Sequence, residues 1–241
     1  MAKEKTLEDI MKEDAGLGLE AYDPAEENRI GFIKIVQKLS KEFDLGKGVG
    51  SLINGATKQT LAEEGDVFKF IPLYYFKDYS IWDKKKFTLI KRSLNKADFT
   101  DEELAWHDRV PPTAQESLNF VVLNADDPTI PMILSFTRTN VKQGQEFRIL
   151  LSDKMTTENI PTFGGIYSIR TVEEKNASGK WSTFASAKFV EKVTDVELYT
   201  KLRGYHKEIS AINFNVLLGG GSEASKAIPE ATATIDSDAK Y

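Results

Sequence analysis

The sequence predicts a mainly β fold with peripheral α-helices and a flexible C-terminal tail. Aromatic and β-branched segments separated by turn residues recur from about residue 66 to residue 190, which is typical of strands. Helical periodicity is confined to three stretches, at residues 3–14, just after residue 100 and at residues 194–210. We therefore expect an N-terminal helical arm at 1–23, a β-rich domain at 24–218 and a mildly acidic tail at 219–241.

The N-terminal third contains one helical pattern and one ambiguous apolar segment. Leu7, Ile10 and Met11 give residues 3–14 one apolar side, as in an amphipathic helix. The apolar residues of segment 24–41 fit either a helix or a buried strand, and periodicity does not decide between them. Four glycines between residues 46 and 55 predict a loop that can approach another backbone or a ligand.

The strongest strand signal begins at Val67 and runs through a series of aromatic residues to Phe76. Pro72 interrupts this run, and because proline has no backbone N–H it indicates an edge strand or a bulge. Alternation places Tyr74 with Phe76 on one face and Tyr75 on the other, so one set can fill the core while the other meets a ligand. Residues 87–91 predict a second strand.

Later segments predict one short helix, four strands and a final helix. Thr100 followed three residues later by Glu103 is a capping-box pattern, which predicts about two helical turns ended by Pro111 and Pro112. Strands are expected at 118–123, 130–139, 165–174 and 182–190, with a turn at 176–179 between the last two. The pattern of residues 194–210 is helical.

Composition excludes several classes of protein. The 241 residues contain no cysteine, which excludes disulfides, cysteine-based zinc sites and a cysteine nucleophile. No apolar run approaches the ~18 residues of a membrane helix, and the N-terminus is charged where a signal peptide would be apolar. We therefore expect a protein without a membrane partner that stays in the cytoplasm of a cell.

Catalytic motifs are absent from the sequence. The two histidines, His107 and His206, have no motif around them, and no G-x-S-x-G sequence occurs. Residues 46–51 are glycine-rich but do not match the phosphate-binding loop G-x-x-x-x-G-K-[ST]. The pair Asp126 and Asp127 before a proline is explained by a turn. We predict a protein that is not an enzyme, with no cofactor and no metal; a carboxylate-based hydrolase is a weaker third possibility.

Aromatic and cationic residues interleave in the middle of the chain, and this pattern is typical of single-stranded nucleic-acid binding. Cations follow the phosphates, and aromatic faces stack on the bases. The segment Lys69–Lys96 holds 8 basic residues against two aspartates. The predicted stacking residues are Tyr75, Tyr79, Trp82 and Trp181, and the predicted phosphate contacts are Lys84, Lys85, Lys86, Arg92, Arg138 and Arg148. Alternatively, the aromatics are ordinary β-core residues and the lysines a solvated turn.

Three blocks resemble the single-stranded-DNA-binding proteins of bacteriophages. They are residues 65–73 running into 79–82, residues 131–139, and the acidic tail. The resemblance implies an OB-like β-barrel, non-catalytic and sequence-tolerant binding of single-stranded DNA, and a role in DNA replication or recombination in the cytoplasm of the bacterial host. The tail lacks a dense acidic ending, and residues 92–117 lack the cysteines of some relatives, so no zinc is implied.

A structural or packaged component of a phage particle is the alternative function. The same aromatic cluster would then be a protein interface, and the blocks of opposite charge would set contacts between subunits. The expected partners are single-stranded DNA, replication proteins that could bind the C-terminal tail, and a second copy of the chain as a candidate homo-oligomer.

Overall fold

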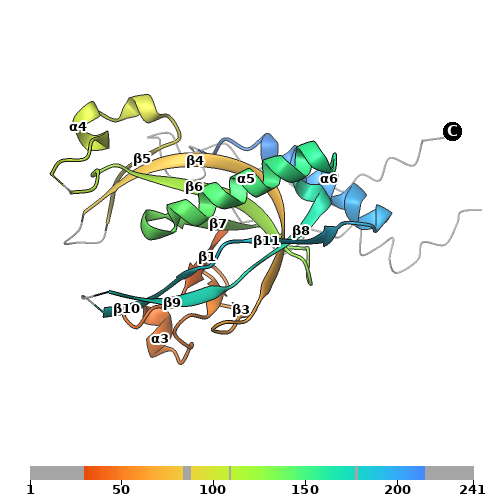
Figure 1. The fold of residues 1–241 in the computed structure, drawn as a ribbon, viewed down its shortest axis with the longest axis horizontal. Coiled ribbons are helices and arrows are strands. Elements are labelled where there is room, and N and C mark those ends of the chain that lie inside the picture. The colour runs from red at the N-terminus through yellow and green to blue at the C-terminus, as the bar shows by residue number, and fades with distance from the viewer. Residues whose placement is uncertain (1–29, 84–87, 109, 177–178, 215–241) are drawn as a thin grey trace, which may run out of the picture.

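The fold is mainly β, as predicted, and its centre is one large curved sheet. A computed structural model describes residues 30–83, 88–108, 110–176 and 179–214. The strands of this sheet run in the order β11–β8–β4–β6–β7–β1–β2–β3, and β5 pairs with the end of β4 on the edge opposite β6. The sheet curls into a half-barrel (Figure 1). Its strands are β1 (Gly31–Ile35), β2 (Leu52–Asn54), β3 (Thr60–Ala62), β4 (Phe68–Trp82), β5 (Leu89–Ser93), β6 (Gln115–Asn124), β7 (Met132–Thr137), β8 (Gly165–Ile169) and β11 (Lys188–Lys192).

The 15-residue strand β4 organises the sheet. It pairs with β8 at its start, with β6 along most of its length and with β5 at its end. The pairing with β6 shifts register between Pro72 and Tyr74, which is the bulge that the proline predicted. A bulge suits proline because the chain gives up a ladder hydrogen bond there. The parallel pair β1–β7 brings the first described strand next to the middle of the sheet.

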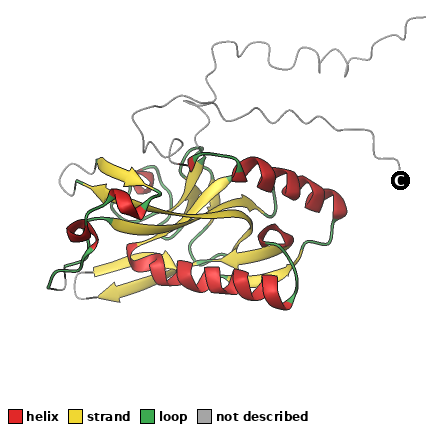
Figure 2. Cartoon of the chain, turned by 90° about the horizontal axis from the view of Figure 1, so that it is seen from above, coloured by secondary structure: helices red, strands yellow, loops and turns green. Residues whose placement is uncertain are grey.

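A long helix covers each face of the sheet (Figure 2). Helix α5 (Val141–Thr157) places Phe147 and Leu151 on the face that carries Phe70 and Phe120. Helix α6 (Val196–Ser210) places Leu202 and Ile209 on the opposite face. The sheet is therefore buried on both sides along its middle, and its strand ends remain available for other roles.

Two of the predicted strands are each divided into two separate strands in the structure. The predicted strand 165–174 ends at Ile169, and β9 (Thr171–Asn176) starts a separate hairpin with β10 (Gly179–Phe184). The predicted strand 182–190 is likewise divided between β10 and β11. The chain leaves the large sheet at Arg170 and returns at Ala185, whose N–H donates to the Arg170 carbonyl at 2.9 Å. Asn176 pairs with Gly179 across this hairpin, in agreement with the predicted turn at 176–179, whose central residues lie outside the described ones.

The structure confirms the predicted capping box at the start of α4 and the predicted helix α6, and it contains a long helix, α5, that was not predicted. The capping box of Thr100 and Glu103 is present, but α4 (Asp101–Leu104) makes one turn rather than two. Helix α6 is confirmed, with Asp195 as its N-cap. Helix α5 was not predicted. Four short helical segments complete the described part of the fold: α3 (Lys41–Asp44), η1 (Lys96–Asp98), η2 (Arg138–Asn140) and η3 (Thr162–Gly164).

Several predicted segments lie outside the described residues. These are the helix at 3–14, the N-terminal arm at 1–23 and the tail at 219–241. The ambiguous segment 24–41 contains the strand β1 in its described part. In the parts of the chain that the structure covers, no helix is long and apolar enough to cross a membrane.

Candidate nucleic-acid interface

The predicted aromatic and cationic residues of β4 and β5 meet where these two strands end. Trp82, Leu89 and Ile90 are exposed there, and we call this group the hairpin end. Trp82 is opposite Leu89 in the strand pairing and is 43% exposed, with its indole Nε1 donating to Ser80 Oγ at 3.1 Å. The predicted phosphate contacts Lys84, Lys85 and Lys86 connect the strands but lie outside the described residues. The hairpin end thus presents an accessible aromatic ring beside a basic stretch of sequence.

Tyr75 and Tyr79 lie on the face of β4 that also carries the α5 core. The Tyr75 ring packs against Phe120 with centroids 5.0 Å apart, and its buried hydroxyl has no partner among the described residues. The Tyr79 ring packs against Phe99 at 5.9 Å, and burial, followed by the nearby Glu116 carboxylate, raises the pKa of its phenol. Both rings are half-buried, so less ring surface faces solvent than the sequence pattern suggested.

Glu116 on β6 also binds the one lysine in this part of the strand. Lys77 Nζ lies 2.6 Å from Glu116 Oε1, and this hydrogen bond raises the pKa of the Lys77 ammonium. Lys77 is therefore already paired with a carboxylate on the neighbouring strand.

Arg92 is a structural residue in this arrangement. Its Nε donates to Asp78 Oδ2, and the side chains are 14% and 0% exposed respectively. Asn119 Nδ2 donates to the other Asp78 oxygen at 2.5 Å, and the guanidinium of Arg92 lies over the Phe32 ring at 5.5 Å. A buried carboxylate needs such partners, so the guanidinium predicted to bind phosphate is engaged inside the fold.

The other two predicted arginines are exposed but lie apart. Arg138 starts η2 with a φ of +53°, and its Nε donates to Gln115 Oε1 at 2.6 Å. Gln115 is opposite Ser80 of β4, so Arg138 lies at the same end of the sheet as Trp82. Arg148 projects from the exposed side of α5. The structure therefore brings Arg138 toward the hairpin end and places Arg148 elsewhere.

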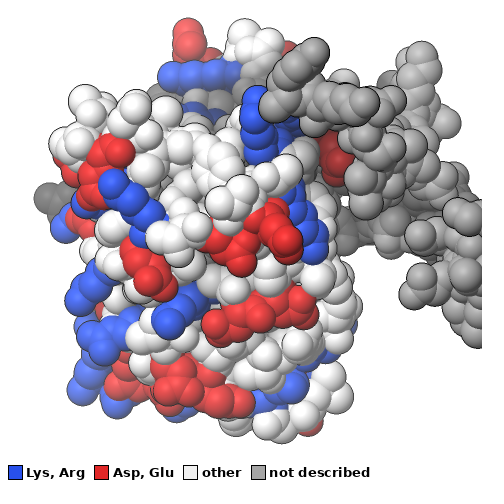
Figure 3. Space-filling view, turned by 90° about the vertical axis from the view of Figure 1, so that its right-hand side faces the viewer, with Lys and Arg blue, Asp and Glu red and all other residues white. Residues whose placement is uncertain are grey.

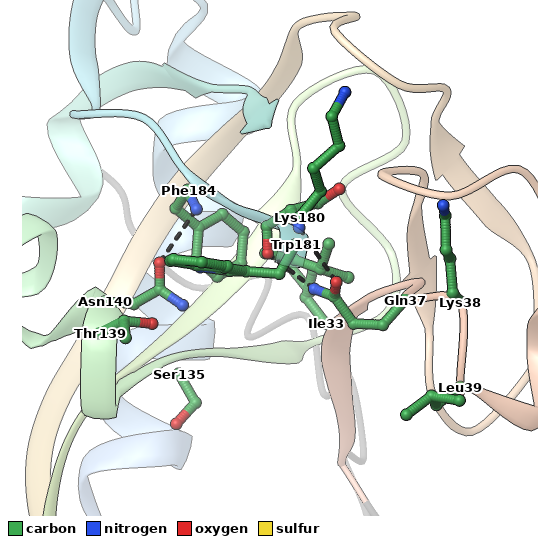
Figure 4. Close-up of a pocket in the computed structure, with 12 residues that line it drawn as sticks. Ile33, Gln37, Lys38, Leu39, Ser135, Thr139, Asn140, Lys180, Trp181 and Phe184 are labelled. Carbon is green, nitrogen blue, oxygen red and sulfur yellow. Dashed lines mark hydrogen bonds between the residues drawn. The ribbon is translucent and has the colours of Figure 1, made fainter. Parts of the chain in front are cut away.

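Trp181 lines a separate pocket of about 450 Å³ between β10, η2 and the segment after β1 (Figure 4). We call it the Trp181 pocket. Apolar side chains and polar groups both line it, namely Ile33, Ile35, Gln37, Lys38, Leu39, Ser135, Thr139, Asn140, Lys180, Ser182 and Phe184 besides Trp181. Sequence reasoning identified Trp181 but missed its neighbours Gln37 and Asn140, because they come from distant segments with no motif around them.

Both histidines have structural neighbours. His206 donates from Nδ1 to the carbonyl of Leu73 at 2.8 Å and packs beside Phe163. His107 lies 3.4 Å from the Glu102 carbonyl at an exposed turn. Among the described residues, no three His, Asp or Glu side chains gather as a metal site.

Charges at the opposite end of the molecule are mixed. Figure 3 views that end, and acidic and basic side chains are interspersed over its surface. The predicted cation–aromatic combination is thus best represented at the hairpin end and at the mouth of the Trp181 pocket, which carries Lys38 and Lys180.

Comparison with known families gives one match. A family model described as Pam3 phage gp34-like protein matches residues 2–214. The chain belongs to this phage protein family. The match confirms the phage origin that the sequence resemblance implied, while the family description names no activity. No curated protein and no solved structure matches the chain.

Proposed function

We propose that this phage protein binds single-stranded DNA without sequence preference and without catalysing a reaction. The hairpin end carries the proposal. It exposes the Trp82 ring at the end of the sheet, directly before the Lys84–Lys86 stretch in the sequence, and Arg138 lies at the same end. This is the combination of a stacking surface and phosphate-neutralising cations that non-specific single-strand binding requires.

We further propose that the protein binds single-stranded DNA during phage replication or recombination. Sequence-tolerant binding protects displaced strands during replication or recombination in the host cytoplasm, with replication proteins recruited through the tail at 219–241. The half-barrel curvature of the sheet supports an OB-like interpretation of the fold. An experimental structure of the complex would test it, because the OB-like mode expects DNA to contact the strands of the half-barrel where α5 and α6 leave them uncovered.

A fluorescence anisotropy titration tests the function. A labelled single strand of ~30 nucleotides and a matched duplex are titrated with the protein at several salt concentrations. We expect preference for the single strand and an affinity that falls steeply with salt, because neutralised phosphates release counterions. Combining Trp82→Ala with alanine at 84–86 should lower the affinity and flatten the salt dependence.

Met155→Ala is the control at an exposed apolar residue. Met155 is 49% exposed near the end of α5, where Glu158 pairs with Lys192 of β11 rather than with β5, so its removal should leave DNA affinity unchanged. Equal losses in the two variants would show that the hairpin end has no special role. Absence of binding even at low salt would refute the function itself.

A structural role in the phage particle is the second candidate. The observation that favours it is a series of exposed apolar side chains near α4, namely Trp106, Val110 and Ile90. Exposed apolar side chains of this size are typical of protein contacts. Mass spectrometry of purified particles tests this role: stoichiometric amounts of the protein in the particle would support it, and its absence would exclude it.

A further inference from the structure

The Trp181 indole is held in position by two side-chain amides on either side of it. Gln37 forms two hydrogen bonds with Ser182, since its Nε2 donates to the carbonyl at 2.6 Å and its Oε1 accepts from the N–H at 3.0 Å. Asn140 Oδ1 accepts from the Phe184 N–H at 3.0 Å and from the Thr183 hydroxyl. These bonds fix the β10 backbone next to Trp181, so the ring is placed before any ligand arrives.

Keeping the Trp181 ring along the pocket has a cost in free energy. Trp181 Nε1 is buried and has no hydrogen-bond partner among the described residues. A buried donor without an acceptor costs free energy, and such exceptions in native proteins call for an explanation. The ring is nevertheless kept along the pocket, where Figure 4 shows the indole lying across the space above Ser135.

Asn140 supplies a donor to the same space. Its Oδ1 must face the Phe184 N–H, because a backbone N–H can only donate, and this fixes the orientation of the whole amide. Both acceptor positions of the oxygen are then used. The Nδ2 group, which forms no hydrogen bond with the described residues, remains for an acceptor atom in the pocket, beside the Thr139 side chain (Figure 4).

Two lysines lie at the mouth of the pocket. Lys38 and Lys180 both line it and come from different segments of the chain. Lys180 Nζ lies 2.6 Å from Glu173 Oε1, but both side chains are about half exposed, so this pair is weak and can exchange for another anion. The volume of about 450 Å³ is within the usual range of small-molecule sites.

We propose that the Trp181 pocket binds one nucleobase, stacked on the Trp181 indole with an acceptor atom on Asn140 Nδ2 and the adjoining phosphates at Lys38 and Lys180. This inference rests on the proposed function and assigns one nucleotide of the bound strand to a defined site. A donor-only contact is compatible with sequence tolerance, since purines and pyrimidines alike carry acceptor atoms on their edges.

Fluorescence of a protein with a single tryptophan tests the proposal. Trp82→Phe with Trp106→Phe leaves Trp181 as the only indole, and the probes are dTMP, a ten-residue oligothymidine and inorganic phosphate. We expect dTMP and the oligonucleotide to quench the emission saturably and phosphate to leave it unchanged. In the otherwise wild-type protein, Trp181→Ala should weaken oligothymidine binding about 5- to 150-fold, the range seen when one stacking residue is removed.

The variant Asn140→Asp tests the proposed contact of the Asn140 amide with the base separately from the role of this residue in anchoring β10. Aspartate keeps an oxygen for the Phe184 N–H and the Thr183 hydroxyl but loses the Nδ2 donor, so dTMP quenching should be lost while the protein still folds. Gln145→Glu, the same change of charge at an exposed position of α5, should behave as wild type. Equal dTMP affinity in Asn140→Asp and Gln145→Glu would overturn the role of the amide.

The outcomes also distinguish this inference from the proposed function. Oligonucleotide binding that depends on the hairpin end but leaves Trp181 emission unchanged would overturn the pocket and keep the function. Saturable quenching by dTMP in a protein that binds no oligonucleotide would keep the pocket as a nucleotide site and refute single-strand binding.

Discussion

Replacing Arg92 by methionine should destabilise the protein without changing how it binds DNA. Asp78 is fully buried, and Arg92 is the cation that neutralises it. Methionine retains much of the apolar stem of arginine but removes the guanidinium. The variant therefore leaves a buried carboxylate whose remaining side-chain hydrogen bond among the described residues comes from the Asn119 amide.

The expected loss follows from burial. Removing one partner of a buried ion pair costs ~3–5 kcal/mol because the other charge stays behind without compensation. Arg92 is 14% exposed, so water can partly reach the site and the lower end applies, about 3 kcal/mol. The lost contact with the Phe32 ring adds roughly 0.5 kcal/mol. For a domain of this size the total of about 3.5 kcal/mol corresponds to a fall in Tm of about 7–14 °C.

A double-mutant cycle measured by urea unfolding checks this value. Asp78→Asn removes the buried charge and keeps an oxygen that can accept from Asn119 Nδ2. Adding it to Arg92→Met should therefore recover about 2 kcal/mol, because no uncompensated charge remains. A loss below about 1 kcal/mol in Arg92→Met, or no recovery in the double variant, would refute the role of the ion pair.

The DNA titration provides the second half of the test. A phosphate-binding arginine contributes about one unit to the slope of log affinity against log salt. We expect the slope of folded Arg92→Met to equal that of the wild type, since the guanidinium is occupied by Asp78. A slope reduced by about one unit would show that Arg92 leaves Asp78 to contact phosphate.

Two further predictions concern the core. Gly144→Ala in α5 should destabilise by about 1–2 kcal/mol in thermal unfolding, because its Cβ would lie 2.6 Å from Phe136 Cβ. Gly204→Ala in α6, where a Cβ meets nothing within 4 Å, should instead stabilise the protein by roughly 0.5–1 kcal/mol. A change in unfolding free energy of the same sign at both positions would contradict this packing. Burial raises the pKa of Tyr167 to about 12, so the unfolded state ionises first and stability should fall by up to about 3 kcal/mol between pH ~10 and 12. In urea unfolding, Tyr167→Phe should not show this loss of stability at alkaline pH. An identical loss in the variant and the wild type would refute the role of Tyr167.

The parts of the fold that sequence could predict are those with local causes. Pro72 lacks a donor and therefore required a bulge or an edge, and the bulge is present. Thr100 and Glu103 form their capping box within one turn. The failures have non-local causes. Helix α5 buries only a narrow stripe that includes Gly144, so its periodicity was too weak to detect, and nothing near Arg170 indicates that the chain changes sheets there.

In the candidate site, too, sequence could identify residues by type but could not predict contacts between distant segments. Trp82 and Trp181 could be identified by residue type, but the anchoring of β10 by Gln37 and Asn140 joins segments 145 and 44 residues apart and has no local signature. The position of Arg92 had a usable signal. Alternation places Asp78 on the same face of β4 as the core residue Phe76, and a carboxylate on a core face requires a cation.

The pairing of β4 has a consequence for synthesis of the chain on the ribosome. The start of β4 at Phe68–Phe70 pairs with Tyr167–Ile169 of β8, roughly 100 residues later. At ~5–20 residues per second, this stretch of apolar strand waits about 5–20 s for its partner. During that interval its free edge can capture other nascent chains, and such distant pairings make folding slow. Low temperature or host chaperones during expression should therefore raise the yield of native protein more than any single surface substitution.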